Sequence, residues 1–132
     1  MKTQLVLALV TAGLGSCAAR PYPAFGIEDG TEPIDHVVVS EASLQDVVQV
    51  GRPQIERVAD GGARVVLVVH NGDIETIEVM AELVLLAEGR EPVGAAGNGQ
   101  VAVIGPDCTV AVGWDWPVGR DSGYEIRLSW NK

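Results

Sequence analysis

A potential nucleophile, Cys17, follows Leu14, Gly15 and Ser16 near the start of this 132-residue chain. A cysteine thiolate is a nucleophile, and two small residues before it leave the backbone open to a peptidase. Leu14 is also the last residue of a ten-residue apolar stretch that begins at Leu5, shortly after the positive charge of Lys2. A ten-residue helix spans only about half of a ~30 Å bilayer core. The stretch therefore predicts a signal peptide over residues 1–16 and not a transmembrane anchor.

The same four residues resemble the lipobox of bacterial lipoproteins, in which an aliphatic residue and two small residues precede a cysteine. The resemblance implies that the thiol of Cys17 receives a diacylglyceryl group and that cleavage falls before it. Ala18, and not aspartate, follows the cysteine, which implies sorting to the periplasmic face of the outer membrane. Two or three acyl chains would anchor the protein almost permanently. The alternative is an ordinary secretory signal with a chance cysteine beside the cleavage point.

The charge balance excludes one class of partner. Removal of residues 1–16 takes away Lys2 and leaves eight Lys plus Arg against 18 Asp plus Glu, a formal net charge of −10. Nucleic-acid binding requires a basic stripe, so we expect no nucleic-acid partner, and the acidity favours a basic protein partner. Lipidation of Cys17 would leave Cys108 without a disulfide partner, and we expect Cys108 to be a small buried apolar residue.

The mature chain divides into a tether and one domain. Residues 17–34 predict the lipidated cysteine and a flexible linker, because Pro21, Pro23 and Pro33 interrupt regular structure. Residues 35–132 predict a single all-β domain, since strand patterns recur about every ten residues, as in antiparallel sandwiches. The segments expected to form strands are 36–40, 44–50, 54–59, 63–70, 76–87, 100–105, 109–116 and 124–130. A helix over 76–87 is the less favoured alternative, because its odd-numbered positions are all apolar.

Three aromatic residues of the C-terminal half are candidates for binding. Trp114 and Trp116 are two residues apart, so their side chains share one face of a strand. Tyr124 begins the next strand. If the tryptophans point inward they belong to the core, which is the preferred interpretation. If they are exposed they form a platform for sugars or partner proteins.

Catalytic patterns are weak throughout the sequence. His36 and His70 are 34 positions apart, and a zinc site needs three or four ligands within reach. His70 with Asp73 and Glu75 is the one local cluster, and the polar end of a strand explains it equally well. We therefore expect a protein that is not an enzyme and that uses neither a cofactor nor a metal.

The run from Leu44 to Leu128 resembles the YcfL-like family of periplasmic lipoproteins. The resemblance lies in LQDVVQVGRPQIERVADGGARVVLVVHN, in the Gly89 turn and in a closing EIRL. The aromatic-rich stretch typical of the family is replaced here by Val84, Leu85 and Leu86. The resemblance implies an immunoglobulin-like sandwich of about seven strands and brings no catalytic residues.

Two functions follow as hypotheses from these patterns. The first is a non-enzymatic envelope lipoprotein whose sandwich docks a periplasmic protein through a sheet face or an edge strand. The second is a binder of glycans or peptidoglycan fragments that uses Trp114, Trp116 and Tyr124.

Overall fold

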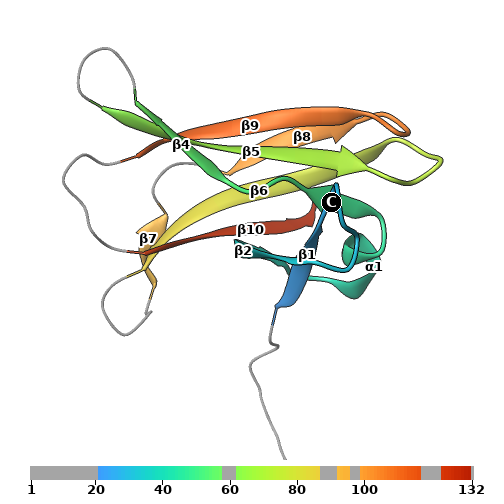
Figure 1. Ribbon diagram of the computed structural model, residues 1–132, viewed down its shortest axis with the longest axis horizontal. Helices are drawn as coiled ribbons and strands as arrows, with labels where there is room; N and C mark the ends of the chain where they lie inside the picture. The colour runs from blue at the N-terminus through green and yellow to red at the C-terminus, as the bar shows by residue number, and fades with distance from the viewer. Residues whose placement is uncertain (1–20, 58–61, 87–91, 96–98, 117–122, 132) are drawn as a thin grey trace, which may run out of the picture.

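The computed structural model describes residues 21–57, 62–86, 92–95, 99–116 and 123–131 (Figure 1). The predicted signal peptide, the lipobox residues Leu14, Gly15 and Ser16, and Cys17 lie outside these residues. The elements are β1 (Tyr22–Gly26), β2 (Pro33–Val39), α1 (Ala42–Gln45), β3 (Val48–Val50), β4 (Gln54–Arg57), β5 (Ala63–Asn71), β6 (Ile77–Leu86), β7 (Pro92–Ala95), β8 (Gln100–Ile104), β9 (Thr109–Trp116) and β10 (Tyr124–Trp130).

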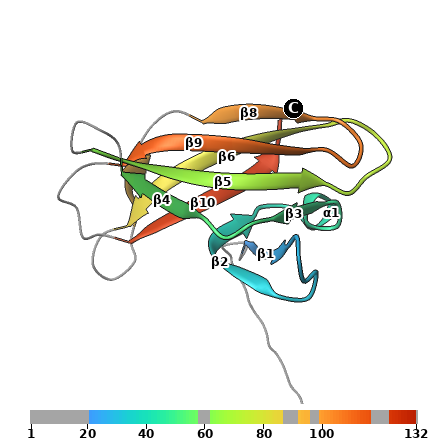
Figure 2. The same cartoon turned by 45° about the horizontal axis from the view of Figure 1, so that its top comes forward.

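Hydrogen bonds join the ten strands into one sheet in the order β4-β5-β3-β1-β2-β10-β6-β7, with β9 paired to β5 and β8 paired to β6. The sheet curls on itself around a single interior (Figure 2). The expected all-β fold is confirmed. The sheet is mixed and not purely antiparallel, because β1 runs parallel to β3 and β10 runs parallel to β2. It is also one sheet, and the expected pair of antiparallel sheets is not what the pairing shows.

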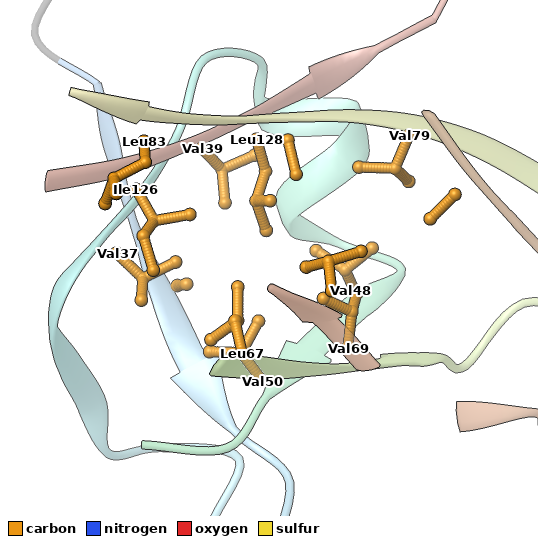
Figure 3. Close-up of a cluster of buried hydrophobic side chains, with 14 of the residues drawn as sticks. Val37, Val39, Val48, Val50, Leu67, Val69, Val79, Leu83, Ile126 and Leu128 are labelled. Carbon is orange, nitrogen blue, oxygen red and sulfur yellow. The ribbon is translucent and has the colours of Figure 1, made fainter. Parts of the chain in front are cut away.

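The core lies on the inner face of this curled sheet, where aliphatic side chains from distant strands meet (Figure 3). Alternation along β5 and β6 explains how these side chains reach it. Val65, Leu67 and Val69 of β5 are buried, and so are all the odd-numbered residues of β6 from Ile77 to Leu85. The strand interpretation of residues 76–87 is therefore confirmed, and the helical alternative is wrong for Ile77–Leu86. Successive side chains of a strand point to opposite faces, so every second residue reaches the core.

The linker prediction is wrong for the part that the structure describes. Residues 22–26 form β1, which lies between β2 and β3, so this segment is an inner strand of the sheet. Its prolines occupy tolerated places: Pro33 is the first residue of β2, and Pro23 lies beside an irregularity in the β1–β2 pairing. Ala24 is buried in the core. Proline lacks the N–H that a strand donates to its neighbour, but at a strand end or a bulge the missing hydrogen bond does not prevent the strand from forming.

Smaller differences concern local structure. Residues 44–50, expected as one strand, divide into the end of α1, which buries Leu44, and the short strand β3. The strand β7 was not expected. Cys108 is exposed and free, and not buried as predicted. It lies in the turn between β8 and β9, where its N–H donates to the Gly105 carbonyl at 3.1 Å, and a tight turn leaves its side chain in solvent.

Candidate protein-docking groove

The three aromatic candidates do not form an open platform in the described structure. Trp114 is 4% exposed and belongs to the core, as the inward interpretation expects. Tyr124 is 9% exposed, and its ring stacks on His36 with centroids 4.4 Å apart. Burial raises the pKa of the Tyr124 hydroxyl. Trp116 ends β9, and its side chain lies outside the described part. Trp114 and Tyr124 therefore stabilise the interior.

The histidine cluster expected from the sequence is also rearranged. His70 does not engage Asp73 or Glu75; its Nδ1 lies 2.8 Å from the Thr109 hydroxyl and its Nε2 lies 3.2 Å from the Asp107 carboxylate. Both ring nitrogens thus contact residues at the β8–β9 turn and the start of β9. The described residues contain no group of three or more His, Cys, Asp or Glu side chains placed to hold a metal ion.

A groove of about 490 Å³ lies on the outer face of β5, and we take it as the candidate site. Three parts of the chain form it: the end of β1 with the following turn, the connection from β3 to β4, and the outer side chains of β4 and β5. The lining residues are Gly26, Ile27, Glu28, Glu32, Ile34, Val50, Gly51, Arg52, Gln54, Glu56, Val66 and Val68. Its volume falls within the range of about 300–1,000 Å³ that is common for ligand clefts.

Short-range hydrogen bonds fix the turn that forms one wall of the groove. The Thr31 hydroxyl and N–H both donate to the Asp29 carboxylate, at 2.7 and 2.9 Å. The hydroxyl bond, and then the backbone bond, lower the pKa of Asp29. The Gly26 N–H donates to the Glu32 carbonyl at 3.0 Å and closes the turn. These bonds stabilise the conformation of this wall.

Two backbone hydrogen bonds and one ion pair join the segments of the groove to one another. The Ile27 N–H donates to the Val50 carbonyl at 3.0 Å, and the Gly51 N–H donates to the Val68 carbonyl at 2.9 Å. The Arg52 guanidinium pairs with the Glu32 carboxylate. The groove is thus preformed on strands whose other face is packed in the core. A preformed site loses little conformational entropy when it binds.

The floor of the groove is apolar and open to solvent. Val66 and Val68 point outward from β5, on the side opposite its buried residues. Val68 is 36% exposed, and Ile27 across the groove is 40% exposed. The rim carries three glutamates and one arginine, which gives the lining a formal net charge of −2. An apolar floor with a charged rim is the arrangement found at protein interfaces.

The sequence patterns do not predict this groove, although one signal for it is present. The run Val65 to Val69 is apolar at every position, whereas a half-buried strand alternates. A continuous apolar run predicts a central strand, and β5 is indeed paired on both edges, by β3 and β4 on one and by β9 on the other. The outward valines Val66 and Val68 required a further explanation, which the groove supplies. Its other wall comes from the segment that was interpreted as a linker.

Comparisons with known proteins bear on the fold alone. No family model and no curated protein matches the chain. A crystal structure of Campylobacter jejuni cj0090 is similar, with a TM-score of 0.51 and 11% sequence identity, over 74% of this chain and 99% of that one. At that identity the likeness supports the all-β architecture only. Among the described residues, no helix combines the length and hydropathy that crossing a bilayer requires.

Proposed function

We propose that this chain is a lipoprotein anchored through Cys17 to the periplasmic face of the outer membrane, and that its β domain docks another envelope protein without catalysing a reaction. The YcfL-like resemblance is part of this proposal. The observation that carries the docking function is the preformed groove with Val68 and Ile27 exposed on it. When a partner covers apolar side chains that are exposed to water on the sheet, the free energy of the complex falls relative to that of the separate molecules.

The groove supports protein docking better than glycan binding. Sugar recognition through a platform of Trp114, Trp116 and Tyr124 requires exposed rings, and Trp114 and Tyr124 are buried. Titration with peptidoglycan fragments separates the two functions. We expect no change in tryptophan emission, and quenching by the fragments would favour the glycan function.

The anchor is tested by Cys17→Ser. We expect the variant to lose lipid labelling and to appear in the soluble fraction or as an uncleaved precursor, because serine supplies no thiol for the thioether. Unchanged lipid labelling and membrane fractionation would contradict the lipoprotein assignment.

Docking is tested by photocrosslinking in the native envelope. Benzoylphenylalanine replaces Ile27 in the groove or, as the matched control, Ile74, which is 86% exposed and is not a lining residue. We expect a discrete protein adduct from position 27 and none from position 74. Equal adducts from both positions, or none from position 27, would contradict docking through the groove.

A further inference from the structure

We infer that the groove recognises a short cationic and aliphatic peptide segment of its partner, in which Lys or Arg residues stand beside Val, Leu or Ile. This inference rests on the proposed docking function and adds the chemistry of the partner. It assigns the aliphatic side chains to the floor at Val66 and Val68, and the cationic groups to the carboxylates of Glu28 and Glu56.

The distribution of charge around the groove supports a cationic segment. Glu32 is already paired with Arg52. Glu28 and Glu56 stand on two different walls, on the turn after β1 and on β4, and neither has an ion-pair partner among the described residues. Two carboxylates that border one groove repel each other, and a positive charge between them removes that repulsion. A partner with acidic groups would add to it.

A basic residue faces Glu56 across the strand pairing, but its side chain lies elsewhere. Arg64 is directly opposite Glu56 in the β4–β5 pairing. Its side chain lies over Gly113 of β9 instead, since a Cβ built at Gly113 would come within 2.6 Å of the Arg64 Nε. Gly113 leaves room for this arrangement. The Glu56 carboxylate therefore remains available at the groove.

The apolar floor and the charged rim have different tasks in this recognition. Covering Ile27 and Val68 removes apolar surface from water, which supplies affinity without selecting charge. Glu28 and Glu56 select the sign of the partner and speed its approach. The formal net charge of −10 of the mature chain acts in the same direction, although salt limits its range to about 8–10 Å.

The inference is tested with the full-length lipidated protein in phosphatidylcholine nanodiscs. The probe is a fluorescein-labelled peptide of alternating Lys and Val residues, acetylated and amidated, and the control peptide alternates Glu and Val. Fluorescence polarisation measures binding, with empty nanodiscs as the blank. We expect the Lys-Val peptide to bind, salt to weaken it, and the Glu-Val peptide not to bind. Equal binding of the two peptides, or no binding of the Lys-Val peptide, would overturn the inference.

Matched substitutions locate the probe. Glu28→Gln and Glu56→Gln are each expected to weaken binding about two- to fivefold, the usual range for exposed charge pairs. Glu82→Gln removes an exposed carboxylate of β6 that does not line the groove, and it should leave the affinity unchanged. All three variants should melt at the same temperature as the parent, so that any loss reports binding. The same loss for Glu82→Gln as for Glu56→Gln would show non-specific attraction and overturn the inference.

The photocrosslink at position 27 keeps this inference separate from the function on which it rests. The adduct is digested, and the crosslinked partner segment is sequenced. A segment with Lys or Arg beside aliphatic residues supports the inference. A discrete adduct whose segment is acidic or lacks basic residues leaves docking intact and overturns the cationic chemistry. Absence of any adduct contradicts docking itself.

Discussion

Two regions of strand β5 differ in what they bury: one end buries the polar side chain of Asn71, and the outer face exposes the apolar side chain of Val68. At its end, Asn71 is a fully buried polar residue. Its Nδ2 donates to the carbonyls of Glu75, Ile104 and Gly105 at 2.8, 2.9 and 3.1 Å, and its Oδ1 accepts the Asp73 N–H at 2.7 Å. Every polar group of the side chain is thus satisfied within the protein.

On the outer face of the same strand the situation is reversed. Val68 is apolar and exposed, and the nearby groove carboxylates of Glu28 and Glu56 have no ion-pair partner in the described part of the chain. The Asn71 region is complete by itself and fixes the turn after β5. The groove leaves apolar side chains and unpaired carboxylates in solvent, and under the proposed docking function a partner would cover them. The buried Asn71 side chain therefore has its hydrogen-bond partners inside the protein, whereas the exposed groove residues are the ones to which the proposed docking function assigns a partner.

The largest expected effect concerns the inner face of β5. Leu67→Ala removes a fully buried side chain from the core and should lower the free energy of unfolding by about 2–5 kcal/mol, measured by urea denaturation. The neighbouring Val68→Ala, on the outer face, is the control and should cost far less. Similar losses for the two variants would mean that the outer face of β5 is covered, and the comparison would fail.

Asn71→Ala tests the completed polar region. The substitution leaves three carbonyls around residue 71 without this donor, and unsatisfied buried polar groups cost about 1–3 kcal/mol. We expect a loss of about 2–3 kcal/mol in the free energy of unfolding by thermal or urea denaturation. Asn131→Ala is the matched control, since the Asn131 side chain donates to Glu78 at an exposed site and should contribute less than 1 kcal/mol. Equal costs would show that burial of Asn71 has no special importance.

Tyr124 extends the comparison to pH. Its burial raises the pKa above the ordinary value of 10.0, so the unfolded chain ionises this hydroxyl before the folded one does. The folded state then binds more protons than the unfolded state, and stability falls as the pH rises above about 10. Tyr124→Phe should reduce this alkaline loss, measured by urea denaturation across that pH range. An unchanged pH profile in the variant would contradict burial as a cause.

The smallest expected effect on stability belongs to the groove. Val68→Thr keeps the β-branched shape and adds a hydroxyl at an exposed position, and it should change the free energy of unfolding by less than about 0.5 kcal/mol. The same variant should weaken binding of the Lys-Val peptide, since it removes apolar contact at the floor. Val103→Thr, at a 60% exposed position of β8, controls for the substitution itself. A destabilised Val68→Thr variant would assign this side chain to the fold.

Much of the strand content could be predicted from local patterns. Thr109–Trp116 and Tyr124–Trp130 form the strands expected for them. Apolar residues that alternate along a whole strand all lie on one face, and only one orientation of the strand buries that face in the core. The inward interpretation of Trp114 follows from the same alternation. The local pattern does not predict the strand at residues 22–26. Prolines lie within and around this segment, and the strands that pair with β1 come later in the chain.

The candidate groove could not be predicted in the same way. Its walls come from residues 26–34, 50–56 and 66–68, and no local signal states that these segments meet. The acidic charge, the apolar alternation and the period of the strands follow from the residue order alone, because they depend on composition and on neighbouring residues. The place of β1 beside β3, and the meeting of Glu28, Glu56 and Val68 at one groove, become visible in the folded chain alone. Pairing between distant strands depends on the whole core, and that core exists only when the chain is folded.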